Sequence, residues 1–118
     1  MNAMNDFISM RDYLRDFAEK REWTQFHSPK NLAMALAVEA AELLEHFQWV
    51  TEAESHSMEP ERLAAVADEI ADVQLYLVRL ADRLNIDITK AVADKTLKNE
   101  AKYPVEKVRG SSRKYTEY

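Results

Sequence analysis

The chain has 118 residues, one glycine, three prolines and no cysteine, and its formal net charge is −5. A chain of this length is expected to form a single domain over residues 1–118. The scarcity of glycine and proline argues against sandwiches and barrels and excludes a glycine-rich phosphate loop. The absence of cysteine excludes disulfides, thiolate metal sites and a cysteine nucleophile.

The distribution of charge and hydropathy bears on partners and location. An acidic chain is a poor candidate for binding a phosphate backbone, so we expect no nucleic-acid partner. The longest apolar run, residues 32–38, has seven residues and is too short to span a membrane, so we expect no membrane partner. The N-terminus does not resemble a signal peptide, and no cysteine indicates an oxidising compartment. These features predict a cytoplasmic protein.

The first predicted helix runs from about Ser9 to Arg21, where apolar residues recur at spacings of three and four. Residues 9–12 match the pattern of a capping box at its start. The second predicted helix covers residues 29–49, because Ser28 and Pro29 form a favourable cap and first position. It is apolar nearly all round, which is typical of a helix buried on most sides.

A polar segment over residues 51–59 predicts a loop, and Pro60 can open a third helix that ends near residue 85. In this helix seven apolar residues from Leu63 to Leu84 follow one another at alternating steps of three and four, which is the strongest periodicity in the chain. Asp87 can cap a fourth helix over residues 88–102. Residues 104–118 are expected to form an extended basic tail.

Four helices with short connections predict an all-α four-helix bundle. A chain this short buries a modest fraction of its surface. The nearly continuous apolar stripes of the second and third helices exceed what such a bundle covers. We therefore expect a homodimer or a homotetramer.

Two pairs of acids stand out within these apolar helices. Glu39 and Glu42 lie three residues apart on the second helix, and Glu69 and Asp72 lie three apart on the third. Residues at this spacing share a helix face. If the two helices face each other, four carboxylates converge, and their repulsion and lost hydration are costly unless something compensates. A single pair of this kind is ordinary surface charge, whereas two pairs bordered by core residues indicate a site.

A divalent cation is the simplest compensation for this charge, because no lysine or arginine lies between residues 32 and 60. A set of carboxylates favours Mg²⁺ or Mn²⁺ over zinc. Di-iron bundles use a Glu-x-x-His motif on two helices, and His46 does not have that spacing from Glu42. Mg²⁺ commonly bridges carboxylates to substrate phosphates, so a polyphosphate is the substrate class that this chemistry suits.

A nucleoside triphosphate would also need cations and aromatic rings. Lys95 and Asn99 lie one turn apart on the fourth helix, and Arg79 and Arg83 continue the line of acids on the third. Aromatic residues in a small bundle are often core residues. The four that could instead enclose a base are Trp23, Phe26, Trp49 and Tyr76.

The two acid pairs, with 27 residues from Glu42 to Glu69, resemble the motif of the MazG-like all-α nucleoside triphosphate pyrophosphohydrolases. The branch of dCTP pyrophosphatases is the most similar. That likeness rests on residues 23–32, 42–49 and 72–77, on the Lys-x-x-x-Asn of residues 95–99, and on the tail segments 103–105, 109–111 and 114–117.

The resemblance implies hydrolysis of deoxynucleoside triphosphates, dCTP or a related nucleotide, between the α and β phosphates. The products would be a monophosphate and pyrophosphate, and the role would be house-cleaning of the nucleotide pool. Family members assemble as dimers or tetramers with sites between subunits. By position, the catalytic and Mg²⁺-binding residues would be Glu39, Glu42, Glu69 and Asp72, and the substrate-binding residues would be Trp23, His27, Trp49, Tyr76, Lys95 and Asn99.

Two other functions remain open from the residues alone. The chain could be a non-catalytic helical protein-interaction module, in which the acids only solubilise the helices. It could also be a nucleotide-binding regulator that has lost turnover. A metal-dependent rise in melting temperature would separate a metal site from an interaction module.

Overall fold

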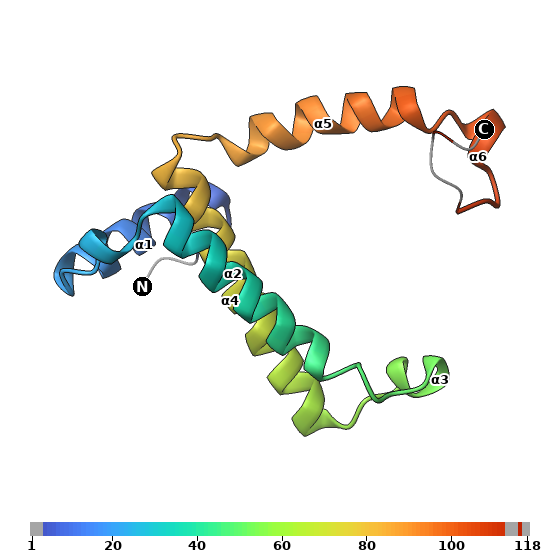
Figure 1. The fold of residues 1–118 in the computed structure, drawn as a ribbon, viewed down its shortest axis with the longest axis horizontal. Helices are drawn as coiled ribbons and strands as arrows, with labels where there is room; N and C mark the ends of the chain where they lie inside the picture. Colours follow the sequence, from blue (N-terminus) through green and yellow to red (C-terminus); the bar gives the residue numbers. More distant parts are fainter. Residues whose placement is uncertain (1–3, 113–115, 117–118) are drawn as a thin grey trace. The chain divides into compact units, whose positions relative to one another are not determined.

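The computed structural model describes residues 4–112 and 116. It comprises two compact units, residues 1–86 and residues 87–118. The first unit holds α1 (Phe7–Lys20), the 3₁₀ helix η1 (Thr24–Phe26), α2 (Pro29–Glu45), α3 (Glu52–Ser55) and α4 (Pro60–Arg83), and the second holds α5 (Ile88–Lys102) and α6 (Val105–Val108) (Figure 1).

The regular structure of the described residues is all helical, as predicted, and the four long helices match the four that the sequence predicts. The described residues contain two further one-turn helices, α3 in the predicted loop and α6 in the predicted tail. The element count is therefore not that of a plain four-helix bundle. Tail residues 113–115, 117 and 118 lie outside the described residues.

Local capping explains three helix starts that were predicted correctly. The Ser28 hydroxyl accepts a hydrogen bond from the Asn31 amide at 3.1 Å, and Pro29 occupies the first turn of α2. Pro60 likewise occupies the first turn of α4, where the N-cap residue Glu59 forms no side-chain capping hydrogen bond. At α5 the Asp87 carboxylate accepts from the amide of Lys90 at 3.2 Å.

The predicted start of the first helix is wrong by two residues. Asp6 caps α1: its carboxylate accepts from the Ser9 amide at 2.7 Å, and the Ser9 hydroxyl accepts from the Asp6 amide at 3.3 Å. Ser9 is thus the third helical residue rather than the cap. This reciprocal capping box satisfies the backbone amides of Asp6 and Ser9, and it sets the start of the helix at Phe7.

The second helix ends at Glu45, one turn before the predicted end at residue 49. Beyond it the backbone tightens, because the amides of His46 and Phe47 donate to the carbonyls three residues earlier, at 3.2 and 2.9 Å. Thr51 then caps the short α3 through a capping box with Glu54. As a result Trp49 lies outside any helix and is 88% exposed.

In the first unit α2 and α4 pack side by side and run in opposite directions, and α1 also packs on α4 (Figure 1). The buried apolar residues Ala18, Leu32, Val66, Val78 and Ala81 come from these three helices. The expectation that the second helix is buried on most sides is wrong for the single chain, because only one face of α2 meets α4 and Leu32 is its buried residue. Among the described residues, no helix is both long and apolar enough to cross a membrane.

Candidate metal centre and adjoining cavity

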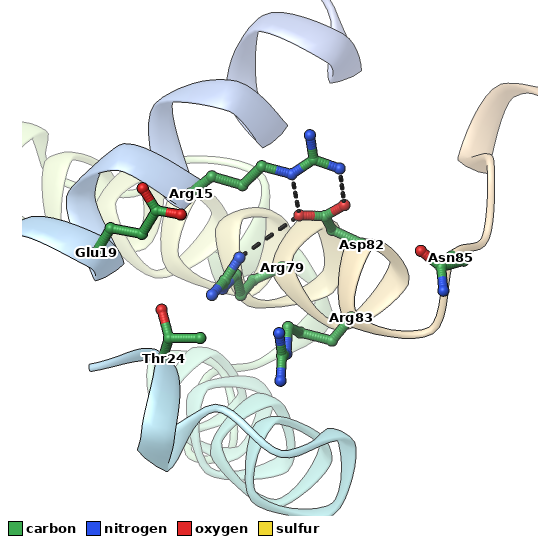
Figure 2. Close-up of a pocket in the computed structure, with 7 residues that line it drawn as sticks. All are labelled: Arg15, Glu19, Thr24, Arg79, Asp82, Arg83 and Asn85. Carbon is green, nitrogen blue, oxygen red and sulfur yellow. Dashed lines mark hydrogen bonds and ion pairs between the residues drawn. The ribbon is translucent and has the colours of Figure 1, made fainter. Parts of the chain in front are cut away.

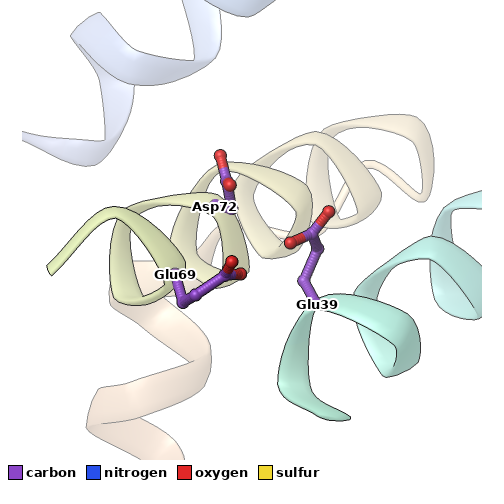
Figure 3. Close-up of side chains that lie close together, drawn as sticks. All are labelled: Glu39, Glu69 and Asp72. Atoms are coloured by element: carbon purple, nitrogen blue, oxygen red, sulfur yellow. The ribbon is translucent and has the colours of Figure 1, made fainter. Parts of the chain in front are cut away.

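Three carboxylates from two helices meet between α2 and α4. Glu39 extends from α2 toward Glu69 and Asp72 on α4, and the three offer ligand oxygens that all lie within 4.8 Å of one another (Figure 3). The antiparallel packing of α2 on α4 brings the helices together at this level. The spacing of three residues on α4 keeps Glu69 and Asp72 on the face that α2 covers.

Within the described residues, hydrogen bonds do not satisfy all the carboxylate oxygens of this group. One oxygen of Glu39 and one of Glu69, Oε2 in each case, are buried and have no hydrogen-bond partner within the part of the chain that the structure describes. A buried carboxylate oxygen without a partner is costly. An oxygen-only set of donors that lacks a protein cation fits a hard divalent ion such as Mg²⁺ or Mn²⁺.

The pKa of Glu39 reflects the same lack of a compensating partner. Burial, together with the nearby carboxylates of Glu69, Glu42 and Asp72, raises the pKa of Glu39 from 4.5 to about 7. The charged form is disfavoured because it loses hydration and meets like charges. Without a metal ion, the cluster lowers its charge by holding a proton.

Glu42, the fourth predicted ligand, is not part of the group of three. It is half-buried one turn after Glu39 on α2, and its negative charge contributes to the raised pKa of Glu39. The structure therefore brings three of the four predicted acids together and leaves the fourth beside them.

A cavity of about 260 Å³ adjoins this centre, and Asp72 belongs to its wall. Three of the predicted substrate-binding residues, Trp23, His27 and Tyr76, line it as well. Rings make up much of the wall: the centroids of Phe17 and Trp23 lie 5.8 Å apart, and those of Trp23 and His27 lie 6.4 Å apart. The remaining wall residues are Tyr13, Leu14, Leu32, Leu75 and Arg79.

Two arginines of α4 hold His27 in this wall. Arg79 Nε donates to His27 Nδ1 at 3.1 Å, and Arg83 Nε donates to the His27 carbonyl at 3.0 Å. Burial, and then the positive charges of Arg79 and Arg83, lower the pKa of His27 below 6.5. The imidazole therefore stays neutral at physiological pH.

Behind this wall lies a second, polar cavity of about 280 Å³ (Figure 2). Asp82 sits between two guanidinium groups there. It accepts from Arg15 at 2.8 and 2.6 Å, and its Oδ2 lies 3.5 Å from Arg79 Nη1. The other residues around this cavity are Glu19, Thr24, Arg83 and Asn85.

The network around Asp82 was not predicted from the sequence. The sequence predicts Arg79 to be a candidate cation for phosphate. In the structure Arg79 is only 4% exposed, and its guanidinium group contacts His27 and Asp82. The one local signal was the spacing of Arg79 and Asp82, which is three residues on one helix. Arg15 and Asp82 are 67 residues apart, and no pattern connects them.

Three further predicted substrate-binding residues are not among the residues that line this cavity. Trp49 follows α2 and is exposed. Lys95 and Asn99 are exposed one turn apart on α5, in the second compact unit.

The chain is thus an all-α protein with a candidate metal centre. In this centre two antiparallel helices bring carboxylates together beside an aromatic cavity. Residues 34–118 match the MazG-like family, and the chain belongs to that family. It is 46% identical over 104 residues to dCTP pyrophosphatase 1 of Homo sapiens and 45% identical to that of Rattus norvegicus, with 86% of this chain covered in each case. The chain spans 61% of the length of these curated relatives.

A solved structure is similar over nearly its whole length. The crystal structure of a pyrophosphatase from Archaeoglobus fulgidus DSM 4304 is 40% identical, with a TM-score of 0.78. The match covers 88% of this chain and 98% of that one. The chain is thus similar in fold, as well as in sequence, to a protein described as a pyrophosphatase.

Proposed function

We propose that the chain is a nucleoside triphosphate pyrophosphohydrolase that uses magnesium. It hydrolyses deoxynucleoside triphosphates, dCTP or a related nucleotide, between the α and β phosphates and releases a monophosphate and pyrophosphate. Its role is house-cleaning of the nucleotide pool. The names of the relatives, dCTP pyrophosphatase and pyrophosphatase, support this activity.

The observation that carries the proposal is the position of Asp72. It belongs both to the group of three carboxylates and to the wall of the aromatic cavity. A ligand whose base or sugar occupies the cavity thus has its phosphates within reach of the metal ligands. The cavity, at about 260 Å³, is slightly smaller than the range of roughly 300–1,000 Å³ typical of drug-sized ligands. It therefore suits one ring system rather than a whole nucleotide.

In this proposal Glu39, Glu69 and Asp72 hold the cation, and Glu42 is the fourth carboxylate. Bound Mg²⁺, or Mn²⁺ in its place, supplies positive charge for the phosphates and lowers the pKa of water. The carboxylates position that charge, and Glu39 or Glu42 takes the proton from the attacking water. No covalent nucleophile is needed, in keeping with a chain that has no cysteine.

The other proposed residues bind the nucleotide. Trp23 offers an aromatic face to the base, and His27 and Tyr76 offer polar atoms in the same wall. The family resemblance supports roles for Trp49 at the base and for Lys95 and Asn99 at the phosphates or the sugar.

We also propose that copies of this chain assemble as a homodimer or homotetramer. Large apolar side chains of α2 and α4 are about half exposed in the single chain, and burying them favours association. Light scattering on the purified protein measures this directly, and a monomer at micromolar concentration would contradict it. The residues concerned are Met34, Val38, Leu44, Leu63, Ile70 and Leu77.

The proposed partners are thus a nucleotide and further copies of the chain. The cytoplasmic location and the lack of a nucleic-acid partner stay predictions, as does the single domain over residues 1–118. Fractionation of cells that express the full-length protein would test the location.

The test of the activity uses the purified chain, millimolar magnesium and a panel of ribo- and deoxynucleoside triphosphates. We expect equimolar monophosphate and pyrophosphate, with dCTP among the best substrates. Glu69→Gln should lose activity, whereas the matched control Asp68→Asn, an exposed neighbour on the same helix, should keep it. Release of orthophosphate without pyrophosphate would exclude cleavage between the α and β phosphates.

A further inference from the structure

Arg79 connects the two cavities of the first unit. It lines both of them and is 4% exposed. On the side of the aromatic cavity its Nε donates to His27 Nδ1 at 3.1 Å. On the side of the polar cavity its Nη1 lies 3.5 Å from Asp82 Oδ2. Arg15 donates two hydrogen bonds to the same carboxylate (Figure 2).

The direction of the hydrogen bond to His27 is fixed by chemistry. A guanidinium group has five N–H donors, no acceptor, and stays protonated at any relevant pH. His27 Nδ1 must therefore be the acceptor and carries no proton. A neutral imidazole has one N–H, so the proton of His27 lies on Nε2.

Several contacts keep the His27 ring in this orientation. Arg83 Nε donates to the His27 carbonyl at 3.0 Å, and Trp23 packs against the ring with an interplanar angle of 66°. In the part of the chain that the structure describes, no residue forms a hydrogen bond with Nε2. Nε2 is therefore the ring nitrogen of His27 that stays available to a ligand, and His27 lines the aromatic cavity.

The polar cavity itself is a support rather than a second ligand site. The Nε atoms of its three arginines all donate to protein acceptors: Arg15 to Asp82, and Arg79 and Arg83 to His27. The carboxylates of Glu19 and Asp82 in the same wall also offset two of the three positive charges. The chain of contacts leads from Arg15 to Asp82, from Asp82 to Arg79, and from Arg79 to His27.

We propose that Arg79 is a positioning residue that fixes His27 as the Nε2–H tautomer, so that the aromatic cavity offers a hydrogen-bond donor to an acceptor atom of the nucleotide, such as a ring carbonyl of a pyrimidine. The part of this inference that concerns the ligand rests on the proposed function. The part that concerns the tautomer does not, because it follows from contacts within the free chain.

The first test measures the tautomer directly, by ¹⁵N NMR of the imidazole in the full chain without metal or nucleotide. We expect a protonated Nε2 and an unprotonated Nδ1 in the wild type. We expect a mixture of tautomers in Arg79→Met, and no change in Arg62→Met, an exposed arginine of the same helix. A protonated Nδ1 in the wild type overturns the proposal, even if Arg79→Met fails to fold.

The second test asks whether the donor at Nε2 is used. The side-chain amide of glutamine can place an N–H where Nε2 lies, whereas that of asparagine reaches only the Nδ1 position. We expect His27→Gln, which keeps an N–H at that position, to raise the KM for dCTP less than His27→Asn does. His27→Asn and Arg79→Met should each raise it about 3- to 10-fold, the loss typical of one neutral hydrogen bond, with kcat nearly unchanged. His56→Asn, in the exposed turn after α3, is the control.

The outcomes separate the inference from the proposed function. If no triphosphate is hydrolysed but Nε2 is protonated, the proposed activity is wrong and the tautomer is established. Binding of dCTP without magnesium, followed by the NMR signal of the Nε2 proton, then decides whether a nucleotide accepts from it. If hydrolysis occurs and His27→Asn has the KM of the wild type, the donor role is wrong.

Discussion

Two clusters on α4 have the same spacing and opposite electrostatics. Glu69 and Asp72 are three residues apart and like-charged, and Arg79 and Asp82 are three residues apart and oppositely charged. The first pair meets Glu39 from α2, with buried oxygens that lack a hydrogen bond among the described residues. The opposite charges of the second pair compensate each other, and Asp82 also forms an ion pair with Arg15. A like-charged group of this kind fits a cation from outside the chain, whereas the oppositely charged pair is satisfied by contacts within the chain.

The pKa values follow this division. Burial and neighbouring carboxylates raise the pKa of Glu39 to about 7, whereas the hydrogen bond from Arg15 holds the pKa of Asp82 below its usual value. In the proposed function, a cation at the acid centre would take the place of this proton. The cluster around Asp82 stays ionised and stabilises the fold over the whole neutral range.

The same substitution at the two aspartates should separate chemistry from stability. Asp72→Asn removes an anionic ligand while keeping the shape of the side chain. We expect activity to fall by at least about 100-fold, since such ligands provide several kcal/mol of charge stabilisation in the transition state. The metal-free melting temperature should not fall, because a repulsion is relieved. Initial rates of pyrophosphate release and thermal melting measure both. Full activity in this variant would remove the acid centre from the mechanism.

Asp82→Asn should have its main effect on stability. The Asp82 and Arg79 side chains are 8% and 5% exposed, so the substitution leaves a buried guanidinium without its anion. We expect a loss of about 2–3 kcal/mol in the free energy of unfolding, measured by urea denaturation. The control is Asp94→Asn, whose partner Lys90 is 75% exposed, and its effect should stay within about 0.5 kcal/mol. Equal effects at both sites would show that burial does not distinguish them.

The pH dependence of the metal-free protein should report on Glu39. Its folded pKa of about 7 exceeds the reference value of 4.5, so between these values the folded state binds a proton that the unfolded state has released. Stability from this group is therefore present at low pH and is lost as the pH rises from 4.5 to about 7. Urea unfolding across this range in EDTA tests the sign, and Glu39→Gln should flatten the profile.

Magnesium should reverse that loss, because a cation takes the place of the proton. At a concentration of 100 times its dissociation constant, the ion would stabilise the fold by about 2.7 kcal/mol above pH 7, and EDTA should remove the effect. A non-catalytic interaction module would show no such dependence. Melting with and without magnesium in Glu69→Gln and Asp68→Asn provides the matched comparison.

Features carried by local sequence were predicted well. The starts of α2, α4 and α5 depend on Ser28, Pro60 and Asp87 and on the residues next to them. The meeting of Glu39 with Glu69 and Asp72 was also predictable, because spacing fixes the helix face and apolar neighbours indicate which face is covered.

Features that depend on distant contacts were not predictable. Nothing near Asp82 in the sequence indicates Arg15, because the pair forms only once α1 packs on α4. The burial of Arg79 depends on the same packing, so a residue expected to meet phosphate instead holds His27. The early end of α2 was missed for a different reason: local backbone bonds in the turn at residues 46–48 end the helix without a glycine to signal it.

The smallest predicted effect concerns the exposed end of the Asp82 cluster. Arg15 donates two hydrogen bonds to Asp82, yet its side chain is 48% exposed. Arg15→Met should therefore cost only about 0.5–1 kcal/mol, because Arg79 still balances the charge of Asp82 and water replaces the lost donors. A double-mutant cycle of Arg15→Met with Asp82→Asn measures the coupling of the pair. A coupling as large as the full effect of Asp82→Asn would mean that Arg15, rather than the buried Arg79, is the residue that Asp82 stabilises. The support of His27 would then not extend beyond Arg79.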